Sequence, residues 1–154
     1  MRARQLACLV ALVLAGGLAP GLEAQDAASA RSVVRAYRAA REATMQERAT
    51  RADVAAAAAL LSDSVVYEHA AAGARLVGRD VLAEGMRGFL GRTRNARIAV
   101  RREIVTPLAV AAEEEVRFET QRDGRWERQS RRQLSVYEVR GGRITRLIEY
   151  WHPR

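Results

Sequence analysis

The sequence has few of the residues that carry covalent, redox or metal chemistry. Its one cysteine is Cys8, and it contains no lysine, so all 26 basic residues are arginine. A single thiol near the N-terminus provides neither a disulfide framework nor a set of thiolate metal ligands. The lack of lysine excludes Schiff-base chemistry and a lysine general base.

Histidine is also scarce, because His69 and His152 are the only two. A zinc site would have to depend mainly on carboxylates, which is unusual for zinc. We therefore expect no metal and no other cofactor. His152 stands beside Pro153 at the C-terminus and is best interpreted as a solvated tail residue. The side chains left for catalysis are His69, the carboxylates and the tyrosines.

The N-terminus has the pattern of a secretory signal peptide. Two early arginines precede an apolar run over residues 6–18, and the small residue Ala24 follows. The run is shorter than the roughly 20 apolar residues of a membrane helix. We predict a signal peptide over residues 1–24, cut after Ala24, and one domain over residues 25–154. This predicts a secreted or periplasmic protein with no membrane partner after cleavage; the alternative is a leader retained as an anchor.

The formal net charge of +8 raises the question of a polyanion partner. The arginines are spread over the whole chain and often alternate with acids, as in residues 125–132. Aromatic residues make up only 5% of the sequence, which leaves few stacking platforms for single-stranded nucleic acid. We expect no specific nucleic acid partner, and binding of acidic polymers is the least favoured hypothesis.

Helical periodicity predicts three helices. Apolar residues recur every three or four positions over residues 32–45, after a flexible start at 25–29. Thr50, with an aspartate three residues later, has the form of a capping box before an alanine-rich helix over 54–61. A third amphipathic helix is predicted over 80–90, although two glycines weaken it.

The remaining segments alternate as strands do. A short strand over residues 65–70 carries His69, and a loop over 71–78 follows it. Turn residues then separate four long strands, which predicts hairpins and a mostly antiparallel sheet. In one of these strands every second residue is apolar except Glu114. The four predicted strands cover residues 97–105, 108–121, 125–139 and 143–151.

Local motifs accompany this order of elements: Asp53-Val54-Ala55, the run from Leu60 to His69, Gly78-Arg79-Asp80, Gly142-Arg143-Ile144 and Glu149-Tyr150-Trp151. The order of elements resembles the nuclear transport factor two-like fold, and the motifs resemble its SnoaL-like branch. The resemblance covers nearly all of residues 30–152. It implies an α+β domain in which three N-terminal helices pack on a curved, mostly antiparallel sheet as a cone-shaped roll.

The same resemblance says little about activity, because the superfamily includes ketosteroid isomerase, polyketide cyclases, scytalone dehydratase, limonene-epoxide hydrolase and noncatalytic binders. In the isomerase, an aspartate is the general base, and a tyrosine with a protonated aspartate forms the oxyanion hole. The resemblance implies that the base falls on His69, the tyrosine on Tyr37 and the second aspartate near Gln133. Two of the three roles differ, so steroid isomerisation is not supported.

Three residues are the candidate catalytic groups. An imidazole at His69 has an ordinary pKa near 6.5 and could exchange protons at neutral pH; the alternative is a histidine tied to a neighbour. Glu149 could orient His69 or act as an acid itself, or it could pair with an arginine such as Arg131. Tyr37 could assist either group.

Six further residues are predicted to line a ligand pocket. The aromatic members could form a wall for a ring-shaped ligand, but any core contains such residues. Glu114 interrupts an apolar stripe, although its place near a strand start could simply expose it. The set is Tyr67, Glu114, Phe118, Arg131, Gln133 and Trp151.

The sequence thus predicts a secreted SnoaL-like protein that binds a small apolar or aromatic molecule in its cone. If it is an enzyme, the expected chemistry is cofactor-free isomerisation, cyclisation or hydration. The alternative is a noncatalytic ligand-binding or dimerisation module whose open sheet face packs against a second copy, and a homodimer is expected.

Overall fold

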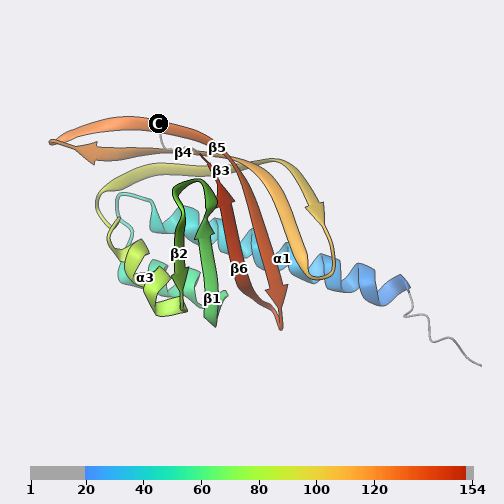
Figure 1. Ribbon diagram of the computed structural model, residues 1–154. Helices are drawn as coiled ribbons and strands as arrows, with labels where there is room; N and C mark the ends of the chain where they lie inside the picture. The colour runs from blue at the N-terminus through green and yellow to red at the C-terminus, as the bar shows by residue number, and fades with distance from the viewer. Residues whose placement is uncertain (1–19, 152–154) are drawn as a thin grey trace, which may run out of the picture.

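The computed structural model describes residues 20–151, which form three helices on one six-stranded sheet (Figure 1). The helices are α1 (Pro20–Thr44), α2 (Arg51–Ala58) and α3 (Arg79–Arg87), with a short 3-10 turn, η1 (Ala70–Ala72). The strands are β1 (Leu61–His69), β2 (Ala74–Val77), β3 (Thr93–Val105), β4 (Ala109–Arg122), β5 (Arg125–Arg140) and β6 (Arg143–Tyr150).

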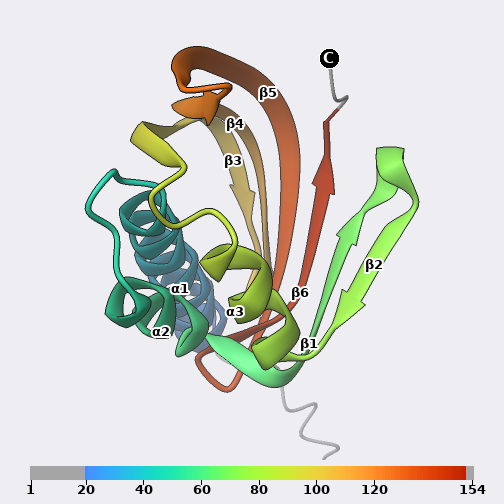
Figure 2. The same ribbon diagram turned by 90° about the vertical axis from the view of Figure 1, so that its left-hand side faces the viewer.

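The sheet is curved and carries all the helices on its concave side, as Figure 2 shows. Its strand order is β2-β1-β6-β5-β4-β3, and every neighbouring pair is antiparallel except β1 with β6. The long strands β3 to β6 follow one another through hairpins. The predicted α+β roll of three helices on a mostly antiparallel sheet is therefore confirmed.

Helix α2 begins where the sequence predicts, because Thr50 caps it. The Thr50 backbone N–H donates to Asp53 Oδ2 at 2.7 Å, and the Asp53 N–H donates back to Thr50 Oγ1 at 3.4 Å. These two bonds satisfy donors that a helix start otherwise leaves without partners. The capping box also holds the pKa of Asp53 below its usual value, through hydrogen bonds from Thr50.

Helix α1 and the turn after it are fixed along the edge strand β3 by side chains that bond to the strand's backbone. Glu42 Oε2 accepts the N–H of Ile98 at 2.9 Å, and Gln46 Nε2 donates to the carbonyl of Ala96 at 3.1 Å. An uncovered edge strand exposes unpaired backbone groups. These contacts cover part of that edge and hold one face of α1 over the sheet, where Tyr37 points inward.

The core lies between the helices and the sheet. Val34 of α1, Val54 of α2, Leu61 and Val65 of β1, and Ile144 of β6 are almost fully buried there. At about 1.5–3 kcal/mol for each buried aliphatic side chain, this packing supplies a large part of the folding free energy.

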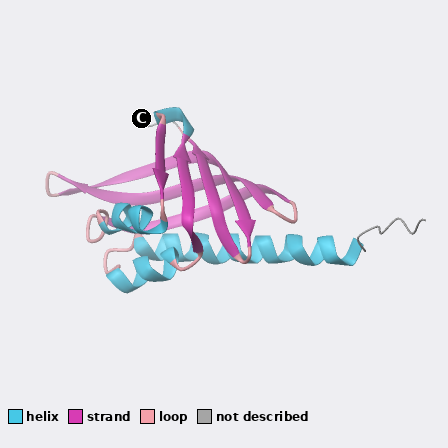
Figure 3. Cartoon of the chain, turned by 60° about the horizontal axis from the view of Figure 1, so that its bottom comes forward, coloured by secondary structure: helices cyan, strands magenta, loops and turns pink. Residues whose placement is uncertain are grey.

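Three local predictions differ from the structure. Residues 25–29 belong to α1, which begins at Pro20 and extends past the sheet (Figure 3), so the predicted flexible start is wrong. The predicted loop over 71–78 contains η1 and β2, because β2 pairs with β1 in a contact that local sequence does not encode. Strand β1 begins at Leu61, since its first residue pairs with Ile144 of β6.

The predicted signal peptide lies mostly outside the described residues, which begin at position 20. Within residues 20–151, no helix combines the length and the apolar character that a bilayer-spanning segment requires.

Candidate functional site

A pocket of about 240 Å³ opens between α1, α3 and the sheet. One side is apolar, and its largest members are Leu82 and Met86 of α3 with Phe89 just after it. The other side is polar and comes from α1, β1, β5 and β6. The polar residues are Tyr37, Arg41, Tyr67, Arg131 and Glu149, with the indole of Trp151 beside them.

Glu149 is the carboxylate of this pocket, and its two oxygens differ. Its Oε2 accepts hydrogen bonds from the Tyr67 hydroxyl at 2.9 Å and from Trp151 Nε1 at 3.2 Å. Its Oε1 has only a long contact, 3.5 Å, from Gln133 Nε2. The first oxygen is thus held in place by two neutral donors, while the second keeps room to accept a proton or a ligand hydrogen bond.

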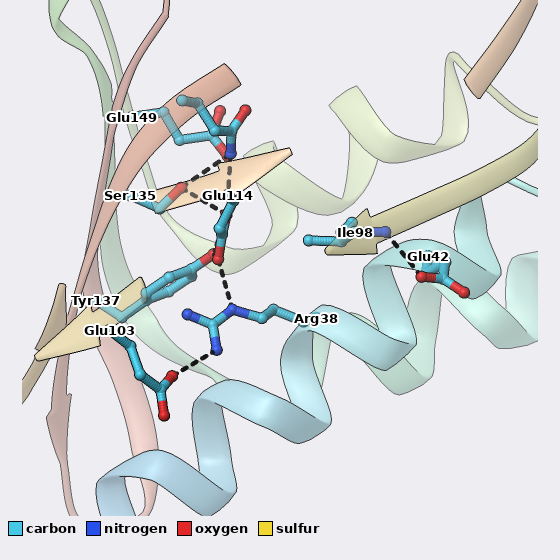
Figure 4. Close-up of polar contacts among 9 residues, drawn as sticks. Arg38, Glu42, Ile98, Glu103, Glu114, Ser135, Tyr137 and Glu149 are labelled. Atoms are coloured by element: carbon cyan, nitrogen blue, oxygen red, sulfur yellow. Dashed lines mark hydrogen bonds and ion pairs between the residues drawn. The ribbon is translucent and has the colours of Figure 1, made fainter. Parts of the chain in front are cut away.

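A second carboxylate, Glu114, lies deeper in the cone and is fully occupied (Figure 4). It is 1% exposed, and Arg38 Nε donates to its Oε1 at 2.5 Å. Ser135 Oγ donates to Oε2 at 2.8 Å, Tyr137 OH donates to Oε1 at 2.9 Å, and Gln133 Nε2 donates to Oε2 at 3.1 Å. The prediction that Glu114 could be exposed at its strand start is wrong.

Glu114 therefore belongs to a buried structural network rather than to an open site. The cavity beside it has a volume of only about 20 Å³, which is close to the space of one water molecule. A second ion pair, from Arg38 Nη1 to Glu103 at 3.3 Å, extends the network toward the surface. A buried ion pair of this kind needs such additional hydrogen bonds to offset its desolvation.

Tyr37 reaches both the open pocket and the inner cavity. Burial raises the pKa of its hydroxyl to about 12; the positive charge of Arg41 opposes this shift, and the carboxylates Glu149 and Glu114 add to it. Tyr37 consequently keeps its proton at neutral pH. It can donate a hydrogen bond to a ligand oxygen, as the prediction of an assisting tyrosine requires.

Tyr67 is held protonated by similar causes. Burial raises the pKa of its hydroxyl, and the charge of Glu149 together with the hydrogen bond to it raises that pKa further. Tyr67 thus remains a donor to Glu149 over the physiological pH range.

An imidazole, an indole and a guanidinium stack beside the open pocket. The His69 ring lies on the Trp151 indole, with centroids 4.1 Å apart and planes 18° apart. The guanidinium of Arg131 lies 4.2 Å from the Trp151 ring centroid and 5.7 Å from that of Phe118. Cation–π contacts of this type fix the plane of an arginine.

The structure thus places His69 outside the lining of both cavities. The side chain is 6% exposed, and its Nε2 lies 2.9 Å from the backbone oxygen of Trp151, with Trp151 stacked against its ring. This geometry favours the alternative in which the histidine is tied to a neighbour. His69 then supports the indole that binds Glu149.

We expect His69→Ala to lower the free energy of unfolding by about 1–3 kcal/mol, because it removes one hydrogen bond and one aromatic stack. His69→Phe keeps the stack and should recover part of the loss in urea unfolding. An alanine variant with unchanged stability and abolished turnover would instead support the catalytic role predicted from the sequence.

The structure separates the predicted site residues. Glu149, Tyr37, Tyr67, Arg131 and Trp151 come together in the open pocket, whereas Glu114 and Gln133 line only the inner cavity, which Tyr37, Arg131 and Glu149 also reach. Phe118 lines neither cavity but a surface hollow of β3, β4 and β5, with the Arg131 guanidinium near its ring.

The register of β5 explains why Arg131 and Gln133 point inward. Strands β4 and β5 pair without a break from Ala109 with Glu138 to Arg122 with Arg125. No bulge changes the faces of β5 in this pairing, so Leu134 points to the outer side and is 45% exposed.

Sequence reasoning missed several residues of the site. Arg41 lies one helical turn after Tyr37, so helical spacing from the tyrosine could have found it. Ser135 and Tyr137 continue the alternation of Arg131 and Gln133 along β5, because every second residue of a strand lies on the same face. Arg38 had no such signal, because its partner Glu114 is 76 positions away.

Within residues 20–151, no group of three or more histidine, cysteine, aspartate or glutamate side chains is placed to hold a metal ion.

The comparisons with known proteins agree with this geometry. A family profile described as a SnoaL-like domain matches residues 34–147, so the chain belongs to the SnoaL-like domain family. The fold is that of nuclear transport factor two-like proteins, whose structures include isomerases, cyclases and an epoxide hydrolase. No curated protein matches the chain.

Three solved structures illustrate the likeness in fold. An LEH-like epoxide hydrolase of M. tuberculosis is 24% identical, with a TM-score of 0.66 over 81% of this chain and 84% of that one. A Catenulispora acidiphila protein of ketosteroid isomerase-like fold, in complex with trimethylamine, is 18% identical, with a TM-score of 0.60 over 77% and 83%. A computationally designed 17-OHP binder is 20% identical, with a TM-score of 0.64 over 80% and 93%.

Proposed function

We propose that this protein binds a small apolar or aromatic molecule in the open pocket and moves a proton on it with Glu149, without a cofactor. The observation that carries the proposal is the pocket itself, in which an apolar wall faces a carboxylate whose Oε1 has only one long contact. A largely apolar pocket with a few convergent polar groups is the usual form of a small-molecule site.

The apolar wall supports a ligand with an apolar body. Phe89 is 54% exposed and Leu76 is 39% exposed, so both leave apolar surface in contact with solvent at the mouth. Covering such surface yields roughly 25 cal/mol per Å². A ligand that occupies the pocket gains this free energy, and the polar side then sets its orientation.

The polar side supports acid/base chemistry. Glu149 Oε1 could take a proton from a ligand carbon or from an attacking water, while the protonated Tyr37 hydroxyl donates a hydrogen bond to a ligand oxygen. The proton returns from Glu149 to the product or to solvent, which restores the carboxylate. Isomerisation, cyclisation and hydration, including hydrolysis of an epoxide, all fit this scheme, and a similar fold serves an epoxide hydrolase.

Noncatalytic binding is the second candidate function. It is favoured by the position of His69, because one of the three predicted catalytic groups lies outside the pocket. A computationally designed 17-OHP binder has a similar fold, which supports this second candidate. Turnover of styrene oxide or of a β,γ-unsaturated ketone by the purified protein supports the first candidate, and binding without turnover supports the second.

Gly85 offers a direct test of the pocket. It lies in α3 on the pocket wall, and a Cβ there meets no atom within 4 Å. We expect Gly85→Leu to fill the pocket and weaken binding of an aromatic probe such as 3-phenylpropanamide by more than about tenfold. The same change should raise helix stability by about 0.5–1 kcal/mol, since glycine is a poor helix former. Calorimetric titration and urea unfolding measure the two effects.

Gly85→Ala is the matched control, because it gives the same gain in helix propensity without filling the pocket. Binding that survives Gly85→Leu unchanged would move the site elsewhere and contradict the proposal.

We also propose that two copies pair through the outer face of the sheet. Ile104 is 72% exposed, and Leu134 and Tyr150 are 45% and 46% exposed on that face. Contiguous apolar surface of this kind is typical of protein contacts. Light scattering should give twice the monomer mass, and Leu134→Arg should restore the monomer. A monomeric wild-type protein would refute this pairing.

We further propose that the protein is exported to the periplasm or the exterior, because residues 1–24 have the pattern of a leader. Mass spectrometry of the exported protein should find a new N-terminus at Gln25.

A further inference from the structure

The open pocket contains more positive than negative charge. Arg41 and Arg131 line it together with one carboxylate, Glu149. Among the described residues, neither guanidinium has a carboxylate within 4.0 Å. Their hydrogen-bond partners are neutral: Arg41 Nη1 donates to Thr44 Oγ1 at 2.9 Å, and Arg131 Nε donates to Gln133 Oε1 at 2.9 Å.

This arrangement contrasts with the outer face of the sheet. There Glu115 pairs with both Arg101 and Arg117, and these pairs hold the pKa of its carboxyl below the usual value. Inside the pocket, neither Arg41 nor Arg131 has a carboxylate partner of this kind within residues 20–151.

The positive charges of the two pocket arginines also repel each other. Burial lowers the pKa of Arg131, and the positive charge of Arg41 lowers it further, while Glu149 acts in the opposite direction. Two like charges in a partly desolvated space are unfavourable unless an anion lies near both. The ligand is a natural source of that anion.

Arg131 is also held ready for such a ligand. Its guanidinium is stacked on Trp151 and faces Phe118, and its Nε is already bonded to Gln133. The plane of the group is therefore fixed before a ligand arrives, which lowers the entropy lost on binding. A planar guanidinium matches the two oxygens of a carboxylate.

We infer that the pocket takes an amphipathic monocarboxylate, with its carboxylate between Arg41 and Arg131 and its apolar body against Leu82, Met86 and Phe89. The inference rests on the proposed function and names its ligand class. Two arginines and one glutamate leave a net charge of one in the pocket, which a monoanion neutralises and a dianion exceeds. Glu149 repels the carboxylate, so the apolar body or its neutral substituents face the free Oε1.

Three compounds with one apolar body test the charge: 3-phenylpropanoate, 3-phenylpropanamide and 3-phenylpropylamine. Calorimetric titration should show the carboxylate binding about tenfold or more tightly than the amide, because charge-assisted hydrogen bonds are stronger than neutral ones. The amine should bind weakest. In Arg41→Gln and Arg131→Gln, the carboxylate should lose this advantage while the amide keeps its affinity.

Arg48→Gln is the control for net charge, because Arg48 is exposed in the turn after α1 and does not line the pocket. It should leave the preference unchanged. Arg131→Lys keeps the charge without the planar fork and should retain only part of the preference, which protects the test if Arg131→Gln folds poorly.

The outcomes distinguish a failure of the anion site from a failure of the proposed function. Amide binding that equals or exceeds carboxylate binding overturns the anion site, and so does an equal loss in Arg48→Gln. If the amide still binds and Gly85→Leu removes it, the proposed function survives that result. If none of the three compounds binds, both the anion site and the proposed function are overturned.

Discussion

Glu114→Ala is expected to lower the free energy of unfolding by about 3–5 kcal/mol, because it leaves the guanidinium of Arg38 buried without its acid. Arg38 is 7% exposed and keeps only the longer contact with Glu103 at 3.3 Å. The substitution also removes the acceptor of Ser135 and Tyr137, and a buried donor without a partner adds its own desolvation cost. Urea or thermal unfolding measures the loss.

Glu113→Ala is the matched control for this prediction. It makes the same chemical change one residue earlier on β4, where the side chain points to the outer face of the sheet. We expect a change within about 0.5 kcal/mol there. Equal effects of the two substitutions would show that Glu114 contributes no more than an exposed glutamate does.

The fold could be predicted because its signals are local. The capping box at Thr50, the alternation through Glu114 and the turns between the strands each depend on residues close in sequence. Strand β2 was missed for the opposite reason. Its four residues are all exposed and show no alternation, so only the pairing with β1 makes them a strand.

The candidate site was predicted in part for the same reason. The sequence analysis named Tyr67, Glu149 and Trp151 as site residues, and the structure brings them together. It also named His69, but a position in a strand does not reveal what stands between a side chain and a cavity. Trp151 occupies that position, and its contact with His69 joins residues 82 positions apart.

The carboxylates Glu114 and Glu149 have different surroundings on the same face of the sheet. Glu114 is surrounded by four donors and one small void, so it holds α1 to the sheet. Glu149 has two donors on one oxygen and an open pocket before the other. Gln133 donates to both, which connects the stable inner network to the outer carboxylate. Glu114 thus stabilises the fold, whereas the proposed chemistry belongs to Glu149, another acid of the same sheet face.

Glu149→Gln is expected to lower kcat/KM by about 10²–10⁴-fold on any compound that the wild-type protein turns over, since this is the usual contribution of a positioned general base. The amide keeps an oxygen that can accept from Tyr67 and Trp151, so fold and ligand binding should remain near wild type. The loss should therefore appear in kcat rather than in KM. Steady-state kinetics, with calorimetric binding of the same compound, separates the two.

Glu68→Gln makes the same change on β1 at a carboxylate that pairs with Arg146 and does not line the pocket. It should leave kcat unchanged. If Glu149→Gln turns over substrate at the wild-type rate, the proton is carried by another group, and the catalytic proposal fails although the pocket remains a binding site. If Glu149→Gln loses binding together with turnover, the carboxylate acts as an anchor for the ligand, because a base that works only in the reaction step leaves the affinity for the ground state unchanged.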